Sequence, residues 1–171
     1  MGDPKKPKKK YRTPSHPWRA ERLAVEKTVK KDYGFVNKKE IWKMESVLNG
    51  FKSQAKKLTK AKTDQSKKEQ ELFINKLSKY GFVNKDAKLE QVLGLELRNV
   101  LDKRLQSVVY RKNIAGTMKQ ARQLIIHGHV LVGNKKISGP SYLVSVEEEP
   151  LVMLSPKSKF SLEVNSKQVK K

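Results

Sequence analysis

The stretch ARQLIIHGHVLVGNKK, from Ala121 to Lys136, contains the change of hydrophobic periodicity that decides the fold. Apolar residues recur at helical spacing as far as Ile125, and beyond Gly128 the segments HVLV and KKI have the short, apolar character of strands. The pair Gly133-Asn134 separates these segments and suits a tight hairpin turn. We therefore predict a helix that passes into a β-hairpin at Gly128, where glycine permits a sharp turn.

This helix is expected to have one apolar and one polar side. Thr117 is a suitable N-cap. The apolar side should comprise Met118, Ala121, Leu124 and Ile125. The opposite side carries polar residues at spacings of four, namely Lys119, Gln123 and His127. A preceding helix, ending near Asn113, is marked by Val100, Leu101, Leu105, Val108 and Val109. After the hairpin, SYLVSV and PLVML predict two further short strands.

The hexapeptide YGFVNK occurs twice, at Tyr33–Lys38 and at Tyr80–Lys85. Its glycine suits the left-handed position that ends a helix, and the following phenylalanine supplies the apolar contact that accompanies such an end. The flanking sequences do not match, so we interpret the two copies as one device that stops and restarts a helix. After the first copy, Asn37 and Glu40 have the spacing of a capping box.

Helical patterns surround these two copies. One covers Trp18–Lys31, and a short one covers Leu89–Leu97. Another follows Asn37, with apolar spacing at Ile41, Met44, Val47, Leu48 and Phe51. The stretch Lys52–Gln70 carries seven lysines and two acidic residues, which predicts either a solvated helix or a helix that faces phosphates. Together with the strands, these patterns indicate an α+β protein with a helical N-terminal region.

The two ends of the chain read as tails. Residues 1–12 hold six basic residues, one acid and two prolines, which predicts a disordered segment that contributes no core. It could bind RNA or act as a nuclear localisation signal, and we favour RNA because the positive charge continues along the chain. The expected division is a basic tail at 1–15, a helical domain at 16–97, a second domain at 98–154 and a basic tail at 155–171.

The charge balance points to a polyanionic partner. Of 171 residues, 39 are Lys or Arg and 17 are Asp or Glu, which gives a formal net charge of +22. Nucleic acid is the natural candidate, because it balances this charge and releases counterions. Polybasic chains also bind membrane surfaces, but no apolar run approaches the roughly 20 residues of a spanning helix. The N-terminus has no secretory signal and cysteine is absent, so we expect a soluble, cytoplasmic protein without disulfides.

Three segments resemble the alpha-L RNA-binding motif: RLQSVVYRKNIAGT (104–117), QARQLIIHGHVLV (120–132) and PSYLV (140–144). The N-terminal HPWRAERL (16–23) resembles the archaeal and eukaryotic branch of the family of ribosomal small-subunit protein four, from which the motif takes its usual name. The resemblance implies two helices followed by a small, strongly twisted antiparallel sheet. The sequence departs from the family at Gln106, where Asp is common, at Asn113, where Gly is common, and in the order of Gly133-Asn134.

The resemblance also implies a function. A member of this family would be a structural constituent of the small ribosomal subunit that binds small-subunit (16S-type) ribosomal RNA directly. It would nucleate assembly of the subunit body and contribute to translational accuracy. Its partners would include neighbouring ribosomal proteins, among them ribosomal small-subunit protein five.

The predicted RNA-binding residues lie in the second domain. Residues 98–142 hold nine Lys or Arg and one acid, Asp102, a local net charge of +8. Guanidinium groups can grip a phosphate through two parallel hydrogen bonds, and such a surface would read RNA shape and backbone rather than base sequence. Arg122 is expected at the margin of its helix, where its removal would have little effect on folding. The candidate residues are Arg98, Arg104, Arg111, Lys119, Gln120, Arg122, Gln123, His127, Gly128, His129, Asn134, Lys135, Lys136 and Ser141.

The pair His127 and His129 raises the question of metal binding or catalysis. Zinc requires three or four converging ligands, and the third histidine, His16, lies in another segment, so no metal or cofactor is expected. Ser141 lacks the context of a nucleophile elbow, and no Walker-type loop exists, so no enzymatic activity is expected. We interpret the pair as the corner between helix and sheet that faces RNA. Tyr110 and Tyr142 could stack on bases, but core packing suits each of them better.

Two other functions compete with this interpretation. An RNA-modifying enzyme, such as a pseudouridine synthase, could carry the motif as an accessory. However, fewer than 100 lysine-rich residues precede the motif here, without a catalytic aspartate in a recognisable setting. A chromatin protein that compacts DNA is the second alternative, which competition between structured RNA and duplex DNA would distinguish.

Overall fold

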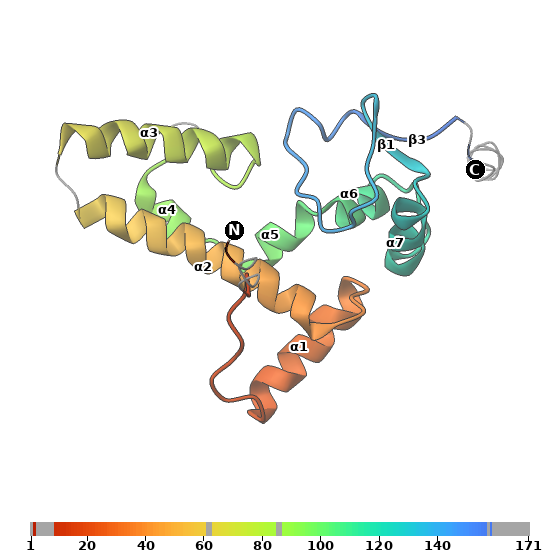
Figure 1. The fold of residues 1–171 in the computed structure, drawn as a ribbon, viewed down its shortest axis with the longest axis horizontal. Helices are drawn as coiled ribbons and strands as arrows, with labels where there is room; N and C mark the ends of the chain where they lie inside the picture. The colour runs from red at the N-terminus through yellow and green to blue at the C-terminus, as the bar shows by residue number, and fades with distance from the viewer. Residues whose placement is uncertain (1, 3–8, 61–62, 85–86, 157, 159–171) are drawn as a thin grey trace.

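The computed structural model describes residues 2, 9–60, 63–84, 87–156 and 158. Seven helices precede a three-stranded antiparallel sheet in this part of the chain, which confirms the expected α+β class (Figure 1). The helices are α1 (Ala20–Asp32), α2 (Lys38–Lys60), α3 (Asp64–Lys79), α4 (Leu89–Leu93), α5 (Leu97–Asp102), α6 (Leu105–Arg111) and α7 (Met118–Ile126). The strands are β1 (Val130–Val132), β2 (Lys135–Lys136) and β3 (Val152–Leu154). No helix of the described residues has the length and apolarity that crossing a bilayer requires.

The buried apolar side chains form two clusters. The first is built by α1 to α5 and extends along the chain from Val29 to Leu101. The second begins at Leu105 and is built by α6, α7 and the sheet, with Ile125 and Val130 fully buried. The packing therefore changes from one cluster to the other between α5 and α6. In Figure 1, α5 lies between the long helix α2 and the part that contains α6, α7 and the sheet.

Both copies of YGFVNK end a helix as predicted. Gly34 and Gly81 have left-handed φ angles of 60° and 68°. The backbone N–H of Phe35 donates to the carbonyl of Lys30 at 3.0 Å. At the end of α3 the N–H of Phe82 donates in the same way to the carbonyl of Leu77 at 3.1 Å. This is the Schellman arrangement, in which the residue after the glycine closes the last turn. Asn113, with φ 57°, takes the same position at the end of α6.

Two predicted helices are broken in the structure. The helix expected to run to Asn113 is divided into α5 and α6, because Arg104 has an extended backbone with φ −70° and ψ 143°. There it forms an isolated antiparallel bridge with Leu143, while the N–H of Leu105 donates to the carbonyl of Tyr142 at 2.7 Å. The lysine-rich stretch 52–70 is likewise divided between α2 and α3, since Thr63 caps α3.

The sheet is smaller than predicted. β1 pairs with β2 and β3 in the order β2-β1-β3, and Val132 opposite Lys135 encloses the expected two-residue turn. PLVML forms β3, but the prediction of a strand at SYLVSV is wrong. The N–H groups of Val144 and Val146 donate to the carbonyls of Lys103 and Lys79, so this segment's hydrogen bonds join loops and helix ends instead of extending the sheet.

The N-terminal segment packs against α2 at its described end. The Tyr11 ring lies 6.3 Å from the Trp42 ring, and the N–H of Arg12 donates to the Ser46 hydroxyl at 3.0 Å. Tyr11 and Arg12, which were predicted to lie in a disordered segment, therefore contact α2, although neither belongs to the buried core. The other predicted tail residues at positions 1, 3–8, 157 and 159–171 lie outside the described part of the chain.

Candidate nucleic-acid interface

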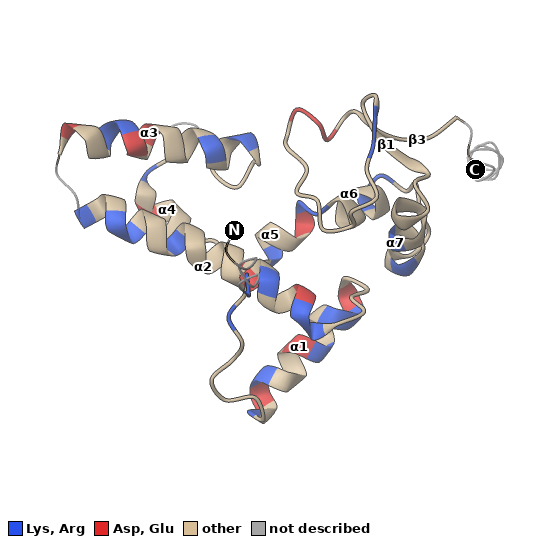
Figure 2. Ribbon diagram, in the orientation of Figure 1, with Lys and Arg blue, Asp and Glu red and all other residues tan. Residues whose placement is uncertain are grey.

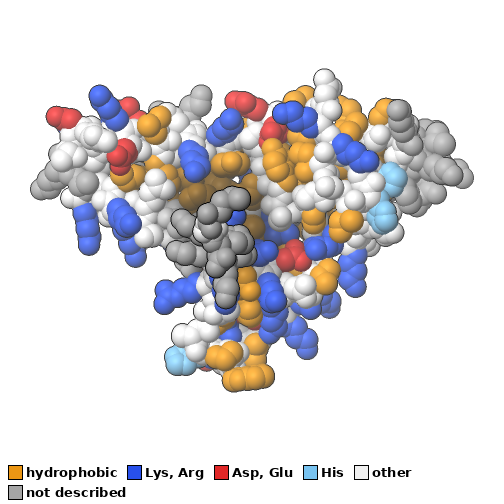
Figure 3. All heavy atoms as spheres, viewed as in Figure 1, with side chains coloured by type: hydrophobic (Ala, Val, Ile, Leu, Met, Phe, Trp, Pro, Cys, Tyr) orange, Lys and Arg blue, Asp and Glu red, His pale blue; other side chains and the backbone are white. Residues whose placement is uncertain are grey.

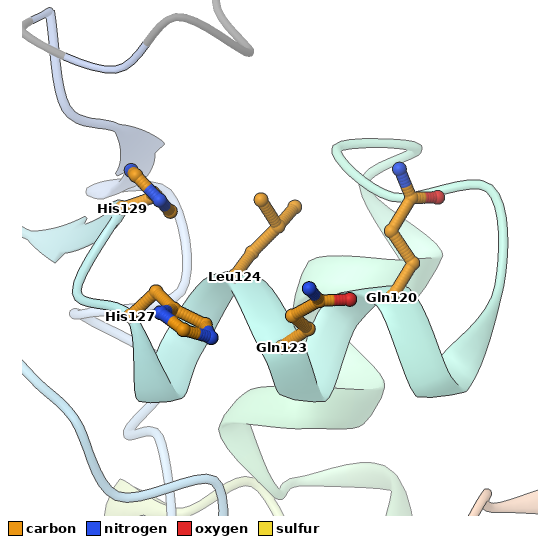
Figure 4. A pocket seen from close by; sticks show the side chains of 5 residues that line it. All are labelled: Gln120, Gln123, Leu124, His127 and His129. Atoms are coloured by element: carbon orange, nitrogen blue, oxygen red, sulfur yellow. The ribbon is translucent and has the colours of Figure 1, made fainter.

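The two histidines flank Gly128 because they form the end of α7. Gly128 has φ 71°, and the N–H of His129 donates to the carbonyl of Leu124 at 2.9 Å, which again is the Schellman arrangement. His127 is exposed, and the centroids of the two imidazole rings lie 6.4 Å apart (Figure 4). Within the described residues no three potential metal ligands lie together. The spacing of the histidines is thus set by the ending of a helix.

The outward side of α7 carries the polar residues that were predicted there. Lys119, Gln120, Gln123 and His127 are exposed, whereas Leu124 is only 3% exposed and packs in the second cluster. The helix begins as expected, because the Thr117 hydroxyl accepts a hydrogen bond from the N–H of Gln120 at 3.2 Å. The apolar side of α7 is therefore fixed in the core and its polar side is available to a partner.

The β-hairpin brings further cations to the end of α7. Asn134, Lys135 and Lys136 are exposed, and the side chain of Lys136 lies across Gly128. A Cβ atom at Gly128 would lie 1.8 Å from Cε of Lys136, so only glycine leaves room for the lysine in this position. Lys119, Lys135 and Lys136 form no ion pair with any described residue. Their charges are available to an external anion.

Arg104 is buried, whereas it was predicted as a surface residue that binds RNA. It is 1% exposed, its Nη2 lies 2.9 Å from Oε2 of Glu40, and its guanidinium lies 4.7 Å from the centroid of the Phe35 ring. Arg104 precedes the helix as the N-cap residue of α6. Its side chain joins the two packing clusters in the interior.

Glu40 binds a second arginine, Arg122 of α7, whose Nη1 lies 2.9 Å from the same carboxylate oxygen. Burial raises the pKa of Glu40, but the hydrogen bonds and charges of Arg122 and Arg104 outweigh it and hold the pKa below its ordinary value of 4.5. The carboxylate is thus engaged with two arginines, in place of the capping box with Asn37 that the spacing suggested. This ion pair gives Arg122, whose side chain is 21% exposed, a structural role that the sequence did not indicate.

Arg98 and Arg111 lie together in a second part of the surface. Both line a shallow cavity of about 280 Å³ at the junction of α1, α5 and α6, with Tyr33 and Asp102 in its wall. Arg111 also pairs with Glu149, which Lys103 holds from the other carboxylate oxygen at 3.3 Å. The Arg111 side chain remains half exposed, so its outer edge is open to a phosphate.

The two tyrosines differ from each other. Tyr142 packs partly against the second cluster as predicted, and its hydroxyl donates to Glu148 at 2.8 Å. Tyr110 is 43% exposed, so its prediction as a core residue is wrong. Ser141 is exposed and precedes Tyr142, whose carbonyl accepts a hydrogen bond from the N–H of Leu105 at the start of α6.

The sequence did not single out Lys31. This residue lines a cavity of about 290 Å³ together with Lys119 and Tyr110, although it belongs to α1. Gln106 brings these elements together, because its Nε2 donates to the carbonyls of Tyr33 at 3.1 Å and Met118 at 2.9 Å. Only the folded chain shows this proximity, since no local pattern links α1 to α7.

Lys and Arg side chains extend well beyond this interface. Figure 2 marks Lys and Arg positions along α1 and α2 as well as in the part that contains α6 and α7, and Figure 3 shows fewer acidic than basic side chains on the face in view. The positive surface is therefore shared by both halves of the molecule.

Comparison with known proteins finds a match to residues 103–150 and a separate match to almost the whole chain. A family model described as the S4 domain matches residues 103–150, which include α6, α7, β1 and β2. Small ribosomal subunit protein uS4 of Methanococcus vannielii is 46% identical over 164 residues, covering 95% of this chain and 92% of that protein. The protein of the same name from Methanococcus aeolicus is 47% identical over 164 residues, covering 95% of this chain and 93% of that protein.

Proposed function

Because the chain belongs to the uS4 family of small ribosomal subunit proteins, we propose that it binds small-subunit ribosomal RNA directly, as a primary binder that needs no other protein. With its S4 domain it is a structural constituent of the small ribosomal subunit. The observation that carries the proposal is the group of exposed lysines formed by Lys119 in the first turn of α7 and by Lys135 and Lys136 on the hairpin, which no acidic residue of the described chain neutralises.

The proposed contacts are mainly to the RNA backbone. Each lysine that neutralises a phosphate releases counterions, and neighbouring amide and imidazole groups add hydrogen bonds. Gly128 contributes through its conformation, and Arg122 contributes with the part of its side chain that Glu40 leaves open. Arg104 is not among the proposed contacts. The proposed RNA-binding residues are Arg98, Arg111, Lys119, Gln120, Arg122, Gln123, His127, Gly128, His129, Asn134, Lys135, Lys136 and Ser141.

We further propose that this binding nucleates assembly of the subunit body and contributes to translational accuracy on cytoplasmic ribosomes. The buried link through Glu40 and Gln106 supports the first role, because a protein whose two halves are fixed can hold two RNA segments in one orientation. Neighbouring ribosomal proteins, including ribosomal small-subunit protein five, are the proposed protein partners. The relatives are named as ribosomal proteins, and we propose no catalytic activity.

The test is binding to naked small-subunit ribosomal RNA in the absence of all other ribosomal proteins. We expect the protein to co-sediment with this RNA. Added unlabelled small-subunit ribosomal RNA should compete for the protein, but an equal mass of duplex DNA or of large-subunit ribosomal RNA should not. Binding that requires prior addition of other small-subunit proteins would contradict the role as a primary binder. Equal displacement by duplex DNA would favour a general nucleic-acid binder of the chromatin type.

A further inference from the structure

A hollow of about 200 Å³ lies beside α7 and differs in chemistry from the lysines around it. Gln120, Gln123, Leu124, His127 and His129 line it (Figure 4). We propose that this hollow takes one unstacked nucleobase of the ribosomal RNA and that Gln120 donates a hydrogen bond to an acceptor atom on the edge of that base. This inference rests on the proposed RNA-binding function and adds to it one contact that reads a base.

The walls of the hollow suit a flat aromatic ring. Figure 4 shows the Leu124 side chain rising from α7 between His129 and Gln120, with His127 and Gln123 on the neighbouring side of the helix. The two imidazoles offer aromatic surface to the face of a base, and Leu124, only 3% exposed, adds a small apolar part of the lining. Proteins bind unpaired RNA bases by such contacts. A phosphate could use only the imidazole N–H groups, whereas a base can also use the faces of the rings.

The amide of Gln120 is held in one orientation. The backbone N–H of Gly116 donates to Oε1 of Gln120 at 2.9 Å, so the oxygen is engaged and the two hydrogens on Nε2 remain to be donated. Gln120 can therefore donate to a base acceptor, such as N7 or O6 of guanine or O4 of uracil. Gln123 has no side-chain hydrogen bond to a described residue, so its amide can turn to donate or accept.

Two lysines lie next to residues that line the hollow. Lys119 precedes Gln120 on α7. The side chain of Lys136 lies across Gly128, the residue that separates His127 from His129 in the chain. A base with a charged backbone on either side needs this combination of an aromatic hollow and flanking positive charge. The same combination makes a neutral small molecule or an apolar peptide a poorer occupant.

The decisive variant is Gln120→Glu, because a carboxylate can still accept from the N–H of Gly116 but cannot donate. Gln91→Glu is the matched control, since it makes the same change from glutamine to glutamate at an exposed position of α4, outside the hollow and outside the proposed RNA-binding residues. Complexes with naked small-subunit ribosomal RNA are probed with dimethyl sulfate and a carbodiimide, which modify base edges, and with hydroxyl radicals, which report the backbone.

We expect wild type and Gln91→Glu to protect an unpaired base that Gln120→Glu leaves reactive, with the same backbone footprint in all three complexes. The affinity of Gln120→Glu should be about tenfold below that of the control, as for loss of one buried hydrogen bond. Identical base protection in wild type and Gln120→Glu would overturn the nucleobase site while leaving the proposed function in place. Absence of any backbone footprint with wild type would overturn both.

A second variant covers the case in which Gln120→Glu melts early. His127→Ala removes one wall of the hollow at an exposed position and keeps the contact between Gln120 and Gly116. Loss of protection at the same base supports the nucleobase site, and retention of that protection overturns it.

Discussion

The guanidinium of Arg104 and the carboxylate of Glu40 lie 2.9 Å apart although 64 residues separate them along the chain. Arg104 stands at the start of α6 and Glu40 in the first turn of α2, so the pair joins the two packing clusters. Arg122 of α7 reaches the same carboxylate oxygen. One acidic residue thus holds two arginines of the S4 domain against the helical region.

Removing this carboxylate should destabilise the protein. In Glu40→Ala the guanidinium of Arg104 is left buried without its partner, and breaking a buried ion pair from one side costs about 3–5 kcal/mol. Chemical denaturation measures the loss. Glu45→Ala, an exposed glutamate on the same helix, is the control and should change the free energy of unfolding by less than about 0.5 kcal/mol. Similar values for the two variants would show that the pair contributes little.

The same carboxylate predicts a dependence of stability on pH. The pKa of Glu40 in the folded protein lies below 4.5, so its ion pairs stabilise the fold above that pH and are lost as the pH falls through the lowered pKa. The free energy of unfolding should therefore decrease between about pH 6 and about pH 3. Glu40→Gln should flatten part of this decrease. If the free energy of unfolding of Glu40→Gln falls with pH as steeply as that of wild type, the acid sensitivity comes from other carboxylates.

Arg122 and Lys119 should behave differently although both lie on α7. Arg122→Ala should lower the free energy of unfolding by about 1–3 kcal/mol, because it removes a charge-assisted hydrogen bond to the partly buried Glu40. Lys119→Ala should stay within about 0.5 kcal/mol, since Lys119 is exposed, but should weaken RNA binding. Thermal melts and RNA titrations of both variants separate the roles. An unchanged melting temperature for Arg122→Ala would show that the ion pair with Glu40 does not stabilise the fold.

Gly128→Ala should destabilise the corner between α7 and β1. A side chain at φ 71° is strained, and the new Cβ would also push the flexible end of Lys136 aside, so we expect a loss of about 1–3 kcal/mol. Gly139→Ala is the control, because nothing lies within 4 Å of the added atom and its φ is not left-handed. Denaturation curves of both variants give the comparison. Equal stabilities would mean that the corner relaxes without cost.

RNA affinity should depend steeply on salt. If about eight phosphates are neutralised, the logarithm of the binding constant should fall with the logarithm of salt concentration with a slope of about −6 to −7. Lys135→Ala should make this slope shallower by about one. Lys103→Ala should leave it unchanged, because Lys103 is already paired with Glu149. A slope near zero for wild type would contradict an electrostatic interface.

Features with local signals were predictable from the sequence. Gly34 and Gly81 end their helices because the apolar residue that closes the turn follows immediately. Thr117 caps α7 through an N–H only three residues away, and Gly133-Asn134 makes a turn whose two strands adjoin it. Each of these structures is complete within a few residues, so the pattern contains all of its parts.

Features that depend on distant partners were not predictable. Arg104 has the sequence context of a surface arginine, and only Glu40, far away along the chain, makes it an interior residue. SYLVSV alternates like a strand, but its partners are the carbonyls of Lys103 and Lys79. A single sequence does not show which charges will be neutralised by a neighbour from another element.

The strand order has a consequence for the protein before it meets RNA. β2 lies at one edge of the sheet and consists of two exposed lysines, Lys135 and Lys136. A free strand edge is a template for pairing with another chain, and lysines on that edge oppose such pairing by charge repulsion. The residues proposed to bind phosphates would thus also protect the newly made chain from edge-to-edge aggregation until it is incorporated into a subunit.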